Sequence, residues 1–171
     1  MNIRLEQADD INTICDVIYL AFENHPHHQL GAKPTEHLIV NDLRTAGELT
    51  LSLVAQDETG IVGHIAFSPV MVTNKHCNFF GLGPVSVLPQ RQKEGIGAKH
   101  IHAGLTALKD RGASGVVLLG EPQYYARFGF TSYPELTLPG VPTEYFVATV
   151  FNHKDNALPT GDVTYHRAFE Q

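Results

Sequence analysis

The sequence predicts one α/β domain, residues 1–171, built on a mixed and mostly antiparallel sheet. Its 171 residues, 43% of them hydrophobic, are enough to bury a core without metals or disulfides. Two apolar strand patterns flank the turn sequence at 57–60 and predict an antiparallel hairpin. A strand, a helix and a second strand follow one another between residues 78 and 119, which predicts a parallel pair. The sheet is therefore expected to contain both kinds of pairing.

The first part of the chain predicts a strand followed by two helices. Residues 2–6 alternate enough for a short strand, and Asp9 is placed to cap a helix. The apolar residues of that helix recur at helical spacing: Ile11, Ile14, Ile18 and Phe22. Residues 23–34 are polar, rich in histidine and interrupted by proline and glycine, so we expect a loop. A second helix is expected to begin at Thr35.

The middle of the chain predicts three strands and a long helix. Leucines alternate with polar or small residues from Leu49, and the apolar run 61–72 forms the second arm of the hairpin. Residues 78–88 are the third strand. The helix after it ends at Gly112 and has one apolar face, marked by Gly97, Ile101, Leu105 and Leu108. These elements set the order of the sheet.

The rest of the chain predicts three further strands and a short helix. Residues 116–119 are a short, continuous apolar run, typical of a buried central strand reached by a right-handed crossover. Residues 122–128 can form the short helix, and 144–151 and 162–169 are expected as late strands.

Charge and cysteine content exclude several classes of protein. A formal net charge of -6 and a pI near 5.9 do not provide the basic face that a nucleic-acid partner requires. Cys15 and Cys77 form no Cys-x-x-Cys pair, and no signal sequence precedes the first periodic segment, so a cytoplasmic location is expected. No apolar run approaches the length that spans a bilayer, so no membrane role is expected.

The segment 92–98, Gln-Lys-Glu-Gly-Ile-Gly-Ala, lies between a strand and the start of a helix. The first N–H groups of a helix have no partner within it, and the helix dipole favours an anion there. Glycines at 95 and 97 let a ligand approach the backbone, so a pyrophosphate would fit. The alternative is a helix start with incidental glycines, and Gly-x-Gly alone does not decide between them.

The surrounding residues resemble a known family. The strand sequence Leu-Gly-Pro-Val-Ser-Val-Leu-Pro at 82–89, followed by Gln92-x-x-Gly95-Ile96-Gly97, is similar to the acetyl-CoA motif of GNAT-type N-acetyltransferases, Gln/Arg-x-x-Gly-x-Gly/Ala after a strand. About thirty residues later, the segment 124–130 resembles the family's second signature, aromatic-Tyr-x-x-x-Gly-Phe. Within the family, the sequence of this second segment is most similar to a YhbS-like bacterial subgroup.

The resemblance implies acetyl-CoA as the cosubstrate, no metal, and a GNAT-like sheet that splays at its centre with helices on both faces. The pantetheine arm then lies in the gap of the splayed sheet and pairs with the main chain of Val85, Ser86 and Val87, whose side chains can be plain core. The pyrophosphate is held at the turn by the seven residues Gln92, Lys93, Glu94, Gly95, Ile96, Gly97 and Ala98.

Two residues of the turn differ from the usual sequence of the family motif. Lys93 stands where glycine is frequent, and Glu94 puts a carboxylate beside the proposed pyrophosphate site. Because backbone amides do most of the holding, we expect Glu94 to point to solvent. These two departures bear on the affinity for CoA and not on the kind of ligand that the turn binds.

Tyr125 is the expected general acid. Acyl transfer from a thioester to an amine needs a neutral amine, a polarised carbonyl and a proton for the departing thiolate. Tyr125 matches the family tyrosine whose hydroxyl reaches the sulfur of CoA, and its alternative role is aromatic packing. A backbone N–H near Val87 is expected to polarise the carbonyl.

The base and the acceptor site are less defined. Glu121 is one candidate base, although its carboxylate could equally cap the following short helix. His64 is another candidate, with a core or surface role as the alternative. The segment between the first two helices borders the acceptor site in this fold, which makes Glu23 and His25 candidate substrate-binding residues. The histidines of that loop lack the ligand spacing of a structural zinc site.

We therefore expect direct transfer of acetyl from acetyl-CoA to a primary amine on a small molecule or peptide. The alternatives are a non-catalytic acyl-CoA-binding regulatory module and a site for another phosphorylated ligand, both of which leave Tyr125 without a use. The identity of the acceptor stays open, and the family resemblance leaves a homodimer as an alternative to a monomer.

Overall fold

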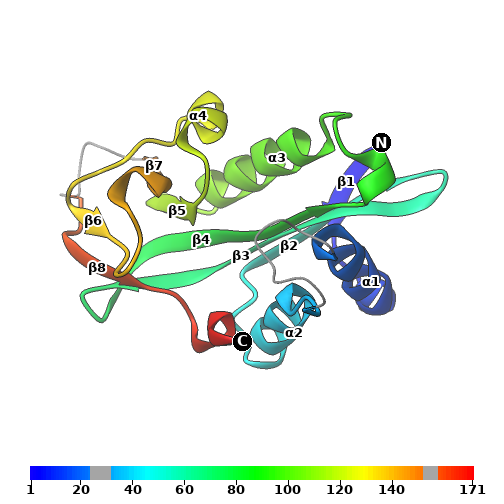
Figure 1. Cartoon of the computed structure of the whole chain (residues 1–171), viewed down its shortest axis with the longest axis horizontal. Coiled ribbons are helices and arrows are strands. Elements are labelled where there is room, and N and C mark those ends of the chain that lie inside the picture. The colour runs from blue at the N-terminus through cyan, green and yellow to red at the C-terminus, as the bar shows by residue number, and fades with distance from the viewer. Residues whose placement is uncertain (24–31, 152–157) are drawn as a thin grey trace.

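The computed structural model describes residues 1–23, 32–151 and 158–171, and its centre is a mixed sheet (Figure 1). The strands follow the order β1-β2-β3-β4-β5-β7, and β8 pairs with both β3 and β6. All pairs along the central path are antiparallel except β4 with β5, and the short pair β6 with β8 is also parallel. The strands are β1 (Asn2–Leu5), β2 (Leu51–Asp57), β3 (Gly60–Val72), β4 (Lys75–Val87), β5 (Gly115–Leu119), β6 (Leu136–Thr137), β7 (Phe146–Val150) and β8 (Gly161–Thr164). The predicted mixed, mostly antiparallel sheet is confirmed.

Helices cover both faces of this sheet, as expected (Figure 1). They are α1 (Ile11–Phe22), α2 (Glu36–Thr45), α3 (Ile96–Asp110) and α4 (Pro122–Tyr125), with short 3-10 segments η1 (Ala8–Asp10), η2 (Pro89–Arg91), η3 (Ala126–Phe128), η4 (Thr143–Tyr145) and η5 (Arg167–Glu170). On one face, Ile101 and Leu108 of α3 pack against Phe67 of β3. On the other face, Ile14 and Ile18 of α1 pack against β2 and β3. The strand residues they contact are next in sequence to those that face α3. This alternation is the period of two that a strand imposes.

The sheet opens between β4 and β5, which is the feature that positions the site. The two parallel strands are in register only over three residues, Phe79–Gly81 opposite Gly115–Val117. Beyond Gly81, β4 continues for six residues to Val87, paired with β3 on its other side. No strand of the described residues pairs with the β5-facing edge of β4 over that stretch. The expected splay is therefore present, at the carboxyl ends of both strands.

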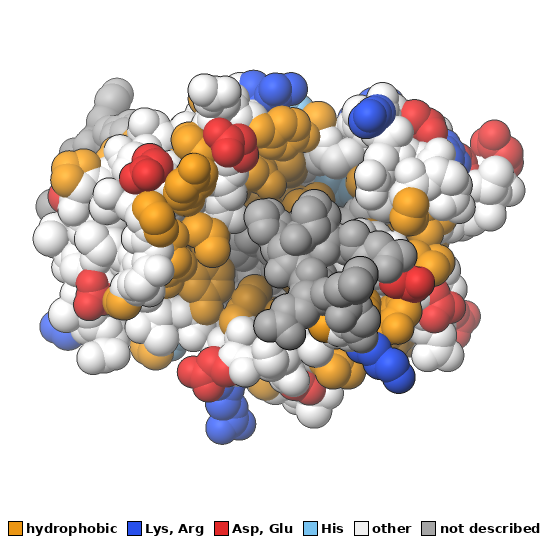
Figure 2. Space-filling view, in the orientation of Figure 1, with side chains coloured by type: hydrophobic (Ala, Val, Ile, Leu, Met, Phe, Trp, Pro, Cys, Tyr) orange, Lys and Arg blue, Asp and Glu red, His pale blue; other side chains and the backbone are white. Residues whose placement is uncertain are grey.

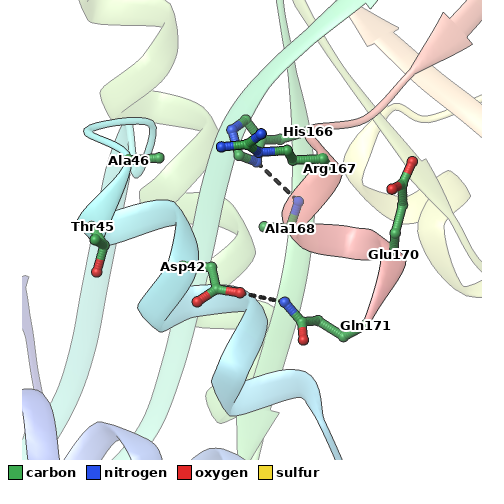
Figure 3. Close-up of a pocket in the computed structure, with 8 residues that line it drawn as sticks. All are labelled: Asp42, Thr45, Ala46, His166, Arg167, Ala168, Glu170 and Gln171. Atoms are coloured by element: carbon green, nitrogen blue, oxygen red, sulfur yellow. Dashed lines mark hydrogen bonds between the residues drawn. The ribbon is translucent and has the colours of Figure 1, made fainter.

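The C-terminal segment folds back against α2 (Figure 3). The His166 side chain accepts a hydrogen bond from the Ala168 N–H (3.0 Å) and so caps η5. The Gln171 amide donates to the Asp42 carboxylate of α2. Ala168 is buried with Leu43 of α2. These contacts fix the position of the side chains on either side of Ala168.

Three details of the expected secondary structure are wrong. Residues 162–169 are not one strand, because β8 ends at Thr164 and the chain turns into η5, which lets Ala168 pack on α2. The two-residue strand β6 was not predicted, because a pattern that short has no period. Asp9 does not cap α1, since η1 precedes the helix and Asp10 instead accepts hydrogen bonds from the Gln7 N–H and from Arg4.

Candidate active site

The turn between β4 and α3 presents backbone N–H groups. Lys93 and Gly95 have φ angles of +67° and +83°, in the left-handed region, and they turn the chain into the first residue of α3. The first hydrogen bond of the helix runs from the Lys99 N–H to the Gly95 carbonyl (3.1 Å). The N–H groups of residues 96–98 therefore lie ahead of the helical ladder and can bind an anion.

The turn is held from both sides by side chains. The Gln92 amide donates to the Val87 carbonyl at the end of β4 (3.3 Å). Arg91 pairs with Glu94 (3.0 Å) and with Asp57 of the β2–β3 hairpin (2.8 Å). The Asp57 carboxylate also accepts hydrogen bonds from Thr59, and these together with Arg91 lower its pKa to about 2. These contacts tie the turn to two neighbouring strands.

Glu94 behaves as the sequence led us to expect. Its side chain is 46% exposed, and its charge is paired with the Arg91 guanidinium. The carboxylate is thus half exposed to solvent, and its charge is partly neutralised. Lys93 also has a structural explanation, because a φ of +67° is the conformation that glycine adopts without strain. The structure therefore accounts for the frequent glycine of the family at this position.

Val85, Ser86 and Val87 lie on β4 where the sheet is open. The side chains of Val85 and Val87 pack in the core, and the Ser86 side chain is buried opposite His64 of β3. Their side chains therefore have packing roles. What they offer a ligand is the main chain of a strand edge, which can take an additional extended partner.

Tyr125 stands at the far end of the opening, over the end of β5. A Cβ atom on Gly120 would lie 2.5 Å from Cε2 of Tyr125, so the glycine is what lets the ring rest on the strand end. The ring also contacts Phe130 (6.0 Å between centroids) and Tyr124 (5.0 Å). Burial, with a smaller contribution from Tyr124, raises the pKa of Tyr125. The phenol is therefore neutral at physiological pH and can donate a proton.

Within the described part of the chain, the other candidate site residues have no contact that assigns them a role. Glu121 is exposed at the N-cap of α4, where its carbonyl accepts hydrogen bonds from the Tyr124 and Tyr125 N–H groups (both 3.1 Å). Its carboxylate makes no capping hydrogen bond, so the capping alternative is wrong. Glu23 is exposed at the C-cap of α1. His25 lies outside the described residues.

A cavity of about 420 Å³ lies where β4 and β5 separate. Its wall includes Leu82, Gly83 and Pro84 of β4 and Leu119 at the end of β5. The wall is completed by residues of α1, α2, the C-terminal segment and the chain directly after β6: Phe22, Glu36, Ile39, Tyr165, Phe169 and Leu138. On the face shown in Figure 2, hydrophobic side chains gather in the middle of the molecule, between α4 and α2.

Sequence reasoning did not find this cavity. Glu36 and Tyr165 are 129 positions apart in the sequence and belong to no motif, so no local pattern could bring them together. Because a strand was predicted over 162–169, the turn that brings Tyr165 and Phe169 to the cavity was not expected.

Comparison with known proteins identifies the family. The model of the acetyltransferase (GNAT) domain matches residues 2–132. The chain belongs to the GNAT acetyltransferase family. This membership confirms the enzyme class and the fold expected from the two motifs.

Two bacterial proteins match this GNAT protein over nearly its full length. It is 33% identical over 176 aligned positions to the uncharacterized N-acetyltransferase YhbS of Escherichia coli (strain K12), covering all of this chain and 99% of that protein. The crystal structure of E. coli YhbS in complex with CoA has a TM-score of 0.88 and 32% identity, and the match covers 99% of this chain and 92% of that one. A GNAT family acetyltransferase from Brucella melitensis, in complex with acetyl-CoA, has a TM-score of 0.84 and 43% identity, over 98% and 97% of the two chains. Both relatives hold the cosubstrate, or its product, that the sequence led us to expect here.

Two histidines of the GNAT domain are buried near the proposed cosubstrate site. Nε2 of His64 lies 2.8 Å from the Ser52 hydroxyl, which also donates to Glu6 (2.6 Å). Burial, together with the smaller effect of the nearby His100, lowers the pKa of His64 to about 3. Burial lowers the pKa of His100 itself to about 4. His64 is thus a neutral residue of the core, which was the alternative to its role as a base.

Among the described residues of this GNAT protein, no three metal-ligating side chains come together, and the histidine-rich stretch lies mostly outside them. Within the same residues, none of the helices combines the length and the apolar character needed to cross a membrane.

Proposed function

We propose that this protein transfers the acetyl group of acetyl-CoA directly to a primary amine. One observation carries the proposal: an anion-binding turn, an open strand edge and a neutral tyrosine follow one another along the gap between β4 and β5. A phosphate-only ligand would need the turn but neither the edge nor Tyr125. The complexes of the two relatives with acetyl-CoA and CoA support the same ligand here.

Each part of the site has a role in this reaction. The N–H groups of residues 96–98 bind the pyrophosphate, and the open edge of β4 pairs with the amides of the pantetheine arm. Acetyl-CoA supplies the acetyl group as a thioester. A backbone N–H near Val87 polarises the carbonyl, and the Tyr125 hydroxyl donates a proton to the thiolate sulfur as the C–S bond breaks. The amine nitrogen forms the new bond to the carbonyl carbon and passes one proton to a base or to solvent, and the Tyr125 phenolate takes a proton back from solvent.

The cavity beside the gap is where we place the acceptor amine. Its wall contains residues 82–84 of β4, the first beyond the pairing with β5, so an amine inside it approaches the gap from the side of α1 and α2. Glu121 and Glu23 stay candidates for proton removal and acceptor contact, as does His25. We also propose that the chain works as one domain in the cytoplasm, without a nucleic-acid or membrane partner.

The experiment is release of free thiol from acetyl-CoA against a panel of amines, with wild type and Tyr125→Phe side by side. We expect thiol release that depends on an amine and falls about 10²-fold or more in Tyr125→Phe. Tight CoA binding with no amine-dependent release would favour a non-catalytic acyl-CoA-binding module. A normal rate in Tyr125→Phe would remove this residue from the mechanism and leave the class of reaction intact. Sedimentation of the same sample decides between monomer and homodimer.

A further inference from the structure

A line of buried polar side chains crosses the face of the sheet that α1 covers. Ser52 of β2, His64 of β3 and Ser86 of β4 come from three neighbouring strands and are 6%, 0% and 2% exposed (Figure 1). Residues two positions along β2 and β3 pack against α1, so Ser52 and His64 share that apolar face. Glu6, directly after β1, continues the line, and we call these four residues the polar row. Polar groups buried among apolar ones cost stability unless they are satisfied or used.

The hydrogen bonds of the polar row fix where its protons are. Although burial acts against it, hydrogen bonds from Arg44 and Ser52 lower the pKa of Glu6, so its carboxylate is charged and can only accept. The Ser52 hydroxyl has one hydrogen and donates it to Oε1 of Glu6 (2.6 Å). It must therefore accept from the ring of His64, whose Nε2 lies 2.8 Å away. Nε2 is thus the ring nitrogen that carries the proton.

The second ring nitrogen of His64 is a bare acceptor. Burial and, to a smaller extent, the nearby His100 lower the pKa of His64 to about 3, so the ring is neutral and Nδ1 carries a lone pair. Within the described residues, neither Nδ1 nor the buried Ser86 hydroxyl has a hydrogen-bond partner. The two residues lie directly opposite each other in the β3–β4 ladder, at a span that one water molecule or a rotation of the hydroxyl closes. The row can therefore accept a proton at Nδ1.

The polar row connects the reaction gap with solvent. Ser86 lies on the open edge of β4, beside the Val87 backbone proposed to polarise the carbonyl. Pro84, two residues before it, lines the cavity in which we place the acceptor amine. At the other end, Glu6 and Ser52 line a separate cavity of about 300 Å³, and the Glu6 side chain is 18% exposed. A proton that enters the row beside Ser86 therefore has an exit to solvent at Glu6.

We propose that the polar row conducts the proton that the amine loses during acetyl transfer from the gap to solvent. The inference rests on the proposed function and gives its proton a route that does not need Glu121. As the N–H bond of the amine breaks, the Ser86 hydroxyl accepts the proton and passes its own to Nδ1 of His64. The proton on Nε2 moves to the Ser52 oxygen, the Ser52 proton moves to Oε1 of Glu6, and Glu6 releases it to water.

The row returns to its first state by the reverse shift. A proton from water enters at Glu6, Nε2 regains its proton from Ser52, and Nδ1 releases its proton to the gap, where the Tyr125 phenolate takes it up. One proton has then left the amine and one has reached the CoA sulfur through Tyr125, so protons and charge balance. A concerted shift leaves the His64 ring neutral before and after each passage, as its low pKa requires.

Ser52 is the residue to change, because it links the two ends of the row. With the amine that wild type acetylates fastest, Ser52→Ala should lower kcat for thiol release about tenfold or more at pH 7, with the Kd for CoA within about twofold of wild type. Ser52→Thr keeps the hydroxyl and should stay within about threefold of the wild-type kcat. The matched control is Ser68→Ala, which should keep the wild-type rate. Ser68 lies on β3, is fully buried and has an unpartnered hydroxyl among the described residues, but it is not part of the row.

The pH profile separates proton conduction from a loss of structure. Without the Ser52 hydroxyl the amine proton must pass to hydroxide or buffer in the gap, so the deficit of Ser52→Ala should shrink to about twofold at pH 9 and on addition of imidazole at pH 7. A purely structural defect would give the same ratio to wild type at every pH. Within the described residues, the charged or titratable groups that act on His64 are Glu6, Arg44 and His100. Hydrogen bonding to Glu6 raises the pKa of Arg44, and burial lowers the pKa of His100 to about 4, so neither changes charge between pH 7 and pH 9.

Nitrogen-15 spectra of the His64 ring test the starting tautomer without turnover. In wild type, Nε2 should carry the proton and Nδ1 should carry none. A proton on Nδ1 would overturn the inference, and so would a wild-type kcat in Ser52→Ala or a deficit that does not change with pH. In each of these cases the proposed function stands, because wild type still releases thiol with an amine. If wild type releases no thiol with any amine of the panel, the proposed function fails, and this inference fails with it.

Discussion

Gly95 offers the sharpest test of the anion-binding turn, because its replacement changes conformation and nothing else. Its φ of +83° lies in the left-handed region, and a Cβ atom built there would meet no atom within 4 Å. Gly95→Ala therefore introduces no clash, and its cost is the strain of an L residue in this region, about 1–2 kcal/mol. For a domain of this size, that should lower Tm by about 2–8 °C.

Gly112 at the other end of α3 is a matched control. Its φ is +87°, and a Cβ atom there would also meet nothing within 4 Å. Gly112→Ala should cost about the same 1–2 kcal/mol. The two variants should differ in CoA binding, because only Gly95 sets the direction of the N–H groups at the start of α3. Loss of one well-aligned hydrogen bond to a charged phosphate costs about 1.5–3 kcal/mol, which is roughly tenfold or more in Kd.

Thermal unfolding and calorimetric titration with CoA measure both quantities on the same preparations. We expect equal losses of Tm in the two variants and a Kd for CoA that rises about tenfold or more in Gly95→Ala alone. Equal CoA affinity in Gly95→Ala and wild type would refute the assignment of the pyrophosphate site to this turn. Equal weakening in both variants would show that loss of stability, and not the direction of the N–H groups, controls binding.

Two further predictions concern the same region. Lys93→Gly should raise the free energy of unfolding in urea by about 0.5–1 kcal/mol, because relief of the left-handed strain outweighs the entropy of glycine; a loss of stability would contradict the geometry at this residue. Between pH 6.5 and 5, stability should fall by about 2 kcal/mol for each of His64 and His100. Their pKa values of about 3 and 4 mean that the unfolded chain binds protons in this range and the native chain does not. Urea unfolding of His100→Leu should show about half the fall, and an unchanged fall would show that His100 does not titrate as a buried group.

The architecture around the turn was predictable because local patterns were strong and agreed with one another. The run 61–72 and the turn at 57–60 together specify a hairpin, and β2 and β3 are paired as expected. Residue 97 and the apolar residues after it give α3 its face, which packs on Phe67. The residues of the proposed cosubstrate site lie in two short segments close together in the sequence, 85–87 and 92–98, so a motif could reveal them.

The acceptor side was not predictable for a physical reason. Its cavity is assembled from α1, α2, β4, β5, the residue after β6 and the C-terminal segment, and each contributes one to three residues. Phe169 reaches it only because η5 replaces the expected strand and docks on α2. Apolar residues such as Ile39 and Leu82 look the same in sequence whether they fill a core or line a cavity. The sequence pointed to Glu23 and His25, while the described cavity is lined by their neighbour Phe22 and by Glu36.

The most direct test of the account is the mass of the product formed from acetyl-CoA and the amine of the panel that releases thiol fastest, followed in time with wild type and Tyr125→Phe. We predict the N-acetylated amine in amounts equal to the CoA released, with formation about 10²-fold or more slower in Tyr125→Phe and CoA affinity unchanged within about threefold. CoA that binds tightly in both proteins without any acetylated amine, for every amine of the panel, would contradict the claim that this gap carries out acetyl transfer.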